Sequence, residues 1–221
     1  MSVYVFLGPS LDRARAKSLL DAHYLPPVKM GDVSALLQEK PKAIGIIDGY
    51  FEYTPAVWHK EVLFALASGV RVFGGGSMGA LRAAELHPFG MEGIGQTFDA
   101  YAGGTLEDDD EVAVAHGRAE DGFLTLSDAM VNLRHGLALA VEAKCIVPST
   151  KSKLEEVAKA LFYPERSWGA LYSAAPSLGV ERHEIEALRN FVDEVKPDIK
   201  RDDAELVLRT MAARLTNDVP A

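Results

Sequence analysis

The sequence is poor in cysteine, in long apolar runs and in positive charge. Its 221 residues include a single cysteine, Cys145, so no disulfide can form within the chain, which indicates a reducing compartment. Apolar runs such as residues 43–47 and 137–141 are far shorter than the roughly 20 residues that a bilayer-spanning helix needs. No membrane span is therefore predicted.

Acidic residues outnumber basic ones by 32 to 23, and the formal net charge is −9. Such a chain repels polyanions on average, so neither nucleic acid nor an anionic membrane surface is expected as a partner. The first residues lack a basic leader and read as a buried strand, which predicts no signal peptide and a cytoplasmic location. With 48% hydrophobic residues, the chain can bury one core, or one core and a helical annex.

Three short aliphatic or β-branched runs predict parallel strands at residues 3–7, 43–47 and 70–73. Their continuous apolar character is typical of strands that are covered on both faces, and helical patterns separate them. Residues 111–115 and 123–126 are interpreted as a hairpin at the sheet edge. The predicted fold class is α/β, with a small, doubly wound, mainly parallel sheet.

Helical patterns account for most of the remaining chain. Within the first half, helices are expected over residues 12–22, 32–39, 55–69 and 80–86. From Ser127 onward, capping residues followed by apolar residues at helical spacing recur, which predicts an α-helical C-terminal region. We place the boundary at residue 126, with an α/β core over residues 1–126 and a helical region over residues 127–221.

Candidate functional residues follow the predicted strands. In an open parallel sheet, ligands bind beyond the carboxyl ends of the strands. Residues 8–10, 48–51 and 74–79 occupy these three ends, and we expect them to converge on one crevice.

The pattern Gly75-x-Ser77-x-Gly79 matches a nucleophile elbow, in which glycines let a strand turn sharply into a helix and expose a serine hydroxyl. Backbone N–H groups at the start of that helix would then be available to a developing oxyanion. A structural interpretation has equal weight: the glycines allow close packing, and Ser77 merely caps the helix. The spacing and the position at the third strand argue against a dinucleotide-binding turn or a phosphate-binding P-loop.

A nucleophilic serine needs a base, and His59, Lys60 and His116 are the basic candidates. Asp48, at the end of a predicted buried strand, could orient a base or hold a substrate. The alternatives stay open, because His59 and Lys60 also fit the polar face of an amphipathic helix and Asp48 could cap a turn. The acidic residues 107–111 are interpreted as a solvated loop that could complement a basic partner surface.

Several sequence blocks together resemble the core of TfuA-like proteins, and this likeness extends over roughly residues 3–133. The blocks are residues 5–10, 43–51, 57–61, 76–86 and 108–116. The resemblance implies partnership with a YcaO protein, which uses ATP to activate a backbone amide oxygen so that sulfide can replace it. It therefore implies an accessory role in backbone thioamidation of ribosomal peptides or proteins, with ATP used by the partner and no cofactor or metal of the chain's own.

Sulfide must be supplied, and a thiocarboxylated ThiS-like sulfur-carrier protein is a plausible donor. Our hypothesis is that Ser77 hydrolyses this thiocarboxylate, with His59 or Lys60 as base and Asp48 orienting it. Residues of the matching blocks that are expected to bind substrate are Ser10, Gly76, Arg82, Glu85 and His116. The alternatives are a non-catalytic binding module that recruits or activates YcaO, and an anion or nucleotide site at the helix N-termini.

Overall fold

The structure is a computed structural model that describes residues 2–52 and 54–216. The chain forms two compact units. The first comprises the chain up to Asp109, Arg118–Leu124 and the chain from Lys200 onward, and the second comprises Asp110–Gly117 and Thr125–Ile199.

The first unit is built on a five-stranded parallel sheet with the order β2-β1-β3-β4-β5. Its strands are β1 Val3–Phe6, β2 His23–Leu25, β3 Ala43–Ile46, β4 Arg71–Gly75 and β5 Glu92–Ile94. The predicted parallel α/β class is confirmed, and the three predicted strands are β1, β3 and β4. The strand order reverses between β1 and β3, which is where doubly wound sheets have their ligand crevice.

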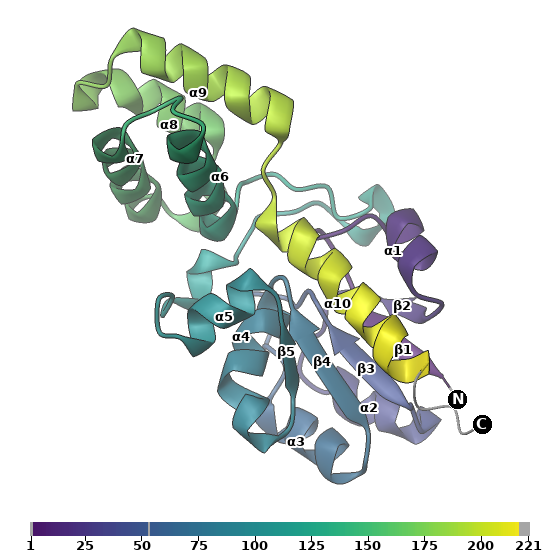
Figure 1. Ribbon diagram of the computed structural model, residues 1–221. Helices are drawn as coiled ribbons and strands as arrows, with labels where there is room; N and C mark the ends of the chain where they lie inside the picture. Colours follow the sequence, from purple (N-terminus) through teal and green to yellow (C-terminus); the bar gives the residue numbers. More distant parts are fainter. Residues whose placement is uncertain (1, 53, 217–221) are drawn as a thin grey trace. The chain divides into compact units, whose positions relative to one another are not determined.

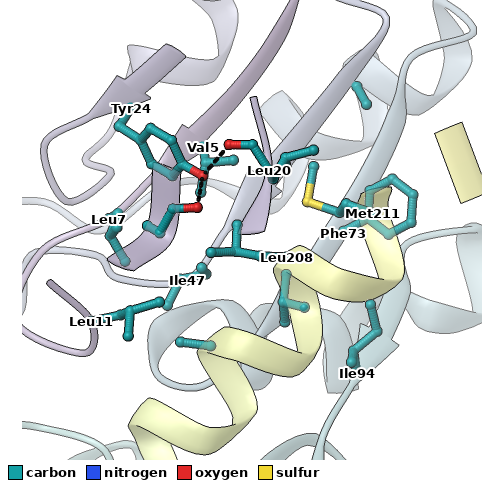
Figure 2. Packing of buried hydrophobic residues seen from close by; sticks show 14 of the residues in the cluster. Val5, Leu7, Leu11, Leu20, Tyr24, Ile47, Phe73, Ile94, Leu208 and Met211 are labelled. Atoms are coloured by element: carbon teal, nitrogen blue, oxygen red, sulfur yellow. Dashed lines mark hydrogen bonds between the residues drawn. The ribbon is translucent and has the colours of Figure 1, made fainter. Parts of the chain in front are cut away.

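Helices cover both faces of the sheet (Figure 1). One hydrophobic cluster joins the strands to α1 Arg13–Leu19 and α10 Ile199–Thr216. The other cluster joins them to α2 Asp32–Leu36, α3 His59–Ala67 and α4 Met78–Leu86. Figure 2 shows Leu208 and Met211 of α10 packed among the strand residues of the first cluster.

Local signals explain where some of these helices begin. Asp12 caps α1, because its carboxylate accepts hydrogen bonds from the N–H groups of Ala14 and Arg15. The carboxylate of Glu61 accepts from the N–H of Trp58 at the start of α3 and from that of Gly31 at the start of α2. This buried glutamate thereby ties two helix N-termini together, and α3 begins at His59 rather than at residue 55 as predicted.

The predicted edge hairpin is wrong. The sheet edges are β2 and β5, which the sequence analysis did not predict, and residues 111–115 are not part of the sheet. Pairing between the two predicted arms amounts to an isolated antiparallel bridge between His116 and Thr125, in the second unit. The physical reason is that Asp110 and Glu111 are held by ion pairs to Arg166 and Arg134 of that unit instead of by a neighbouring strand.

The second unit is helical, which confirms the predicted helical C-terminal region. It contains α6 Met130–Glu142, α7 Pro148–Ala160, α8 Trp168–Ala174 and α9 Arg182–Val195 around a hydrophobic cluster of its own. The last helix, α10, differs from the predicted division because from Lys200 onward it belongs to the first unit. Across the described residues, no helix is both long enough and apolar enough to span a bilayer.

Candidate functional site

Ser77 lies on a very tight turn between β4 and α4. The N–H of Ser77 donates a 2.9 Å hydrogen bond to the carbonyl oxygen of Gly75, which closes a γ-turn around Gly76. Gly76 has a φ of +73°, a conformation that favours glycine. Strand therefore becomes helix within two residues, and Ser77, 6% exposed, occupies the N-cap position of α4.

Glycines also allow α4 to pack directly on the strands. A Cβ atom at Gly79 would lie 1.8 Å from the carbonyl oxygen of Ile46, and one at Gly74 would lie 2.3 Å from that of Gly79. This part of the structural interpretation is correct. Its other part is not, because the Ser77 side chain accepts no hydrogen bond from the first turn of α4, all of which the structure describes.

Two of the backbone donors expected for an oxyanion already have acceptors. The N–H of Gly79 donates to the carbonyl oxygen of Ile47 at 3.1 Å, and that of Ala80 donates to the carbonyl oxygen of Ser77 at 2.9 Å. Together with the Ser77 N–H in the γ-turn, these groups stabilise the fold of the elbow. The N–H groups of Gly79 and Ala80 therefore do not meet the expectation of donors for an oxyanion, which stays a prediction for the N–H of Met78, the residue after Ser77.

Asp48 and Ser10 meet where the strand order reverses. The Ser10 hydroxyl donates to Asp48 Oδ1 at 2.6 Å, and the N–H groups of Gly8 and Ser10 donate to Asp48 Oδ2 at 2.8 and 3.1 Å. Val28 pairs with Gly49 next to them, and Asp48 is only 2% exposed. The carboxylate thus holds the loop after β1, and both side chains are buried at the point where an open crevice was expected.

His59, Arg82 and Glu85 form a second group, on α3 and α4. His59 Nε2 lies 2.8 Å from Glu85 Oε2, and the guanidinium of Arg82 pairs with the same carboxylate. Arg82 Nε also donates to the carbonyl oxygen of Val57 at 3.0 Å. The carboxylate that contacts His59 is therefore Glu85, whereas Asp48 had been predicted to orient the base. Lys60 is exposed.

A cleft of about 340 Å³ opens along α4. Its wall on α4 consists of Met78, Leu81, Arg82 and Glu85, and it is completed by Phe51, Ala56 and the acidic residues 107–109. All of these residues belong to the first unit. Of the predicted substrate-binding residues, Arg82 and Glu85 line this cleft.

Lys200 is a candidate that the sequence analysis missed. It is 3% exposed, and a Cβ atom at Gly76 would lie 3.2 Å from the Lys200 carbonyl oxygen, so the start of α10 packs against the Ser77 turn. A signal was present in the sequence. Lys200 precedes Ala204, Val207 and Leu208 at helical spacing, on the buried face of α10, where a lysine is unusual.

Asp203 fixes the same turn of α10. Its carboxylate accepts hydrogen bonds from the N–H groups of Gln96 at 2.9 Å and Thr97 at 2.8 Å, at the start of α5 Gln96–Ala102. Burial raises the pKa of Asp203, against the opposing effect of these hydrogen bonds. Gly95 has a φ of +101° and leaves room for this carboxylate.

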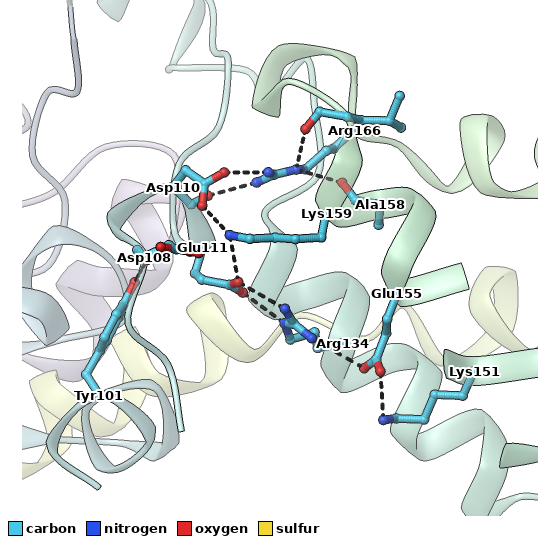
Figure 3. Close-up of polar contacts among 11 residues, drawn as sticks. Tyr101, Asp108, Asp110, Glu111, Arg134, Lys151, Glu155, Ala158, Lys159 and Arg166 are labelled. Atoms are coloured by element: carbon cyan, nitrogen blue, oxygen red, sulfur yellow. Dashed lines mark hydrogen bonds and ion pairs between the residues drawn. The ribbon is translucent and has the colours of Figure 1, made fainter. Parts of the chain in front are cut away.

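The remaining predicted residues lie in the second unit. His116 Nδ1 lies 2.8 Å from the carbonyl oxygen of Gly117. Figure 3 shows that Asp110 pairs with Arg166 and Lys159, and that Glu111 pairs with Lys159 and Arg134. Part of the predicted solvated acidic loop is thus an ion-pair network around Arg166, which is 1% exposed.

Comparison with known proteins gives one family match. A family model described as TfuA-like protein matches residues 48–167. No curated protein matches the chain closely enough to count as a relative. The matched span includes Asp48, His59 and Ser77, whereas Ser10 and Lys200 lie outside it.

Proposed function

Because the chain belongs to the TfuA-like family, we propose that it is an accessory protein in YcaO-dependent backbone thioamidation of ribosomal peptides or proteins. We propose further that it supplies sulfide by hydrolysing a thiocarboxylated ThiS-like carrier, with Ser77 as nucleophile. The observation that carries this finer proposal is the tight turn at Ser77, against which the first turn of α10 packs with its buried Lys200.

The turn presents Ser77 in the manner of a hydrolase nucleophile. It joins a parallel strand to a helix through a glycine with positive φ, and the serine hydroxyl does not cap the helix. Ser77 is 6% exposed, so a substrate has to enter as a narrow chain. A protein thiocarboxylate meets this requirement because it is a chain terminus.

Lys200 is the basic residue that we favour as the proton acceptor, in place of His59 or Lys60. Lys200 is 3% exposed and belongs to the turn of α10 whose backbone packs against the Ser77 turn, and a lysine amine in its neutral form can accept the proton of a serine hydroxyl. His59 is paired with Glu85, and both side chains are more than a third exposed. Serine with lysine is an established variant of the serine, histidine and aspartate triad.

In the proposed reaction, Ser77 Oγ attacks the thiocarboxylate carbon while its proton passes to Lys200. The carbon–sulfur bond then breaks, and sulfide leaves with the proton. Water hydrolyses the resulting acyl-serine and releases a carrier that ends in an ordinary carboxylate. Sulfide is a better leaving group than an amine, so the tetrahedral intermediate collapses with loss of sulfur without a separate acid for an amine.

The test measures the rate at which the Ser77→Ala and Lys200→Met variants release sulfide from a thiocarboxylated carrier. Each variant is expected to lose about a thousandfold or more in rate, and the double variant is expected to be little worse than either. Ser18→Ala, at an exposed serine of α1, is the matched control. If Ser77→Ala releases sulfide at the wild-type rate, the hydrolase proposal fails. Loss in His59→Ala but not in Lys200→Met would reassign the base.

A second candidate function is a non-catalytic module that recruits or activates YcaO. The low exposure of Ser77 and the engaged N–H groups beside it favour this alternative. It predicts that Ser77→Ala supports thioamidation at the wild-type rate with free sulfide and with the carrier alike. The hydrolase proposal predicts rescue of Ser77→Ala by free sulfide alone.

A further inference from the structure

The cleft along α4, called here the α4 cleft, is lined by the residue that follows Ser77. Met78 is the next residue in the chain, and its side chain both lines the cleft and lies against Gly49, where a Cβ atom would be 2.7 Å from Met78 Cγ. Leu81 and Phe51 continue this apolar lining. Apolar side chains thus form a floor in part of the α4 cleft, and Met78 connects this part to the Ser77 turn along the chain.

The charges around this floor do not balance. Arg82 is the cationic residue among those that line the cleft, and it is paired with Glu85. The wall outside α4 carries the carboxylates of Glu107 and Asp109, both of which are exposed. A surplus of negative charge beside an apolar floor selects an occupant that has apolar and positively charged side chains.

Charge also excludes some occupants. A second copy of this chain carries a formal net charge of −9 and would be repelled from this wall. A ligand with negative charge and no positive side chains would be repelled in the same way. An extended peptide segment with lysine or arginine side chains meets both requirements, because alternate residues of an extended chain can face the floor and the acidic wall.

We propose that the α4 cleft is the docking groove for the basic, extended chain end of the sulfur carrier. This inference rests on the proposed function, since it supplies the path by which the thiocarboxylate reaches Ser77. It adds a specificity rule: the residues just before the thiocarboxylate include at least one lysine or arginine and at least one apolar residue.

The experiment measures binding separately from hydrolysis. The probes are a short synthetic peptide of alternating lysine and valine with a free carboxylate end, and its counterpart with glutamate in place of lysine. Their affinities for the wild-type protein and for Ser77→Ala are measured by calorimetry at low and at physiological salt.

Two cleft variants are compared with the wild-type protein. The double variant Glu107→Lys with Asp109→Lys reverses the charge on the wall, and Leu81→Trp fills the floor. Glu120→Lys with Asp121→Lys, at exposed acidic residues outside the cleft, is the matched control.

The lysine peptide is expected to bind wild type and Ser77→Ala equally, and added salt is expected to weaken it. Charge reversal on the wall is expected to weaken binding by about tenfold at low salt, whereas the control changes it little. Equal binding of the glutamate peptide, or full binding by both cleft variants, would overturn the inference. Peptide binding together with undiminished sulfide release by Ser77→Ala would instead leave the groove intact and remove the hydrolase.

Discussion

The hydroxyl of Ser10 donates a 2.6 Å hydrogen bond to the carboxylate of Asp48, which also accepts from two N–H groups of the loop after β1. Both residues are buried. Asp48 thus fastens β1 to β3 where the strand order reverses, and its contacts indicate a structural role next to the proposed site.

Replacement of Asp48 separates this role from a catalytic one. Asp48→Ala leaves the N–H groups of Gly8 and Ser10 without their acceptor, and we expect a loss of about 2 to 4 kcal/mol in the free energy of unfolding. Urea unfolding measures it, with Asp21→Ala at an exposed aspartate as the control. If Asp48→Asn instead keeps wild-type stability and loses sulfide release, Asp48 acts in the reaction.

Gly79→Ala tests the close packing of α4. The added methyl group would lie 1.8 Å from the carbonyl oxygen of Ile46, so helix and strand have to separate. A destabilisation of about 3 kcal/mol or more is expected, or failure to fold. Gly169→Ala in α8, whose new Cβ atom would have its nearest neighbour at 3.7 Å, is expected to fold normally. Thermal unfolding measures the melting temperatures of the two variants. Equal melting temperatures would contradict the argument that α4 packs too closely on β3 to accept a methyl group.

Asp203 gives a prediction about pH. Burial raises its pKa above the ordinary 3.8, so the folded protein holds the proton more tightly than the unfolded chain does. Its contribution to stability is therefore greatest below the ordinary pKa and declines as the pH rises through the higher folded value. We therefore expect the free energy of unfolding of wild type, relative to that of Asp203→Asn, to fall as the pH rises. Urea unfolding over a pH series measures this difference. A difference that grows with pH would show that the charged carboxylate is the stabilising form.

Glu205 is expected to show the opposite dependence. Its hydrogen bond to Arg15 is the main cause that lowers its pKa to about 2. A lowered pKa contributes stability above the unfolded value of 4.5, and this contribution is lost as the pH falls toward 2. Because both side chains are partly exposed, we expect Glu205→Gln to cause a small loss of melting temperature near neutral pH that shrinks with added salt. A loss of melting temperature that is equally large in acid and at high salt would contradict this expectation.

Local sequence patterns predicted a good part of the fold and one element of the site. The apolar runs of β1, β3 and β4, the cap at Asp12 and the glycines around Ser77 act through neighbours close in the chain, so the strands and the strand-to-helix turn could be predicted. Strands β2 and β5 could not, because each has three residues and is held by pairing with distant strands.

Tertiary structure decided which side chains meet. The sequence by itself determined that Ser77 sits on a sharp turn after a buried strand, since glycine conformation and apolar spacing are properties of adjacent residues. Packing of α10 against that turn brings in Lys200 from more than a hundred residues away. The hydrogen bond between Gln96 and Asp203 likewise joins residues that are 107 positions apart. His59 likewise contacts Glu85 rather than Asp48 because α3 and α4 pack on the same face of the sheet. Such pairings depend on how whole elements bury their apolar faces, and no local pattern encodes the partner.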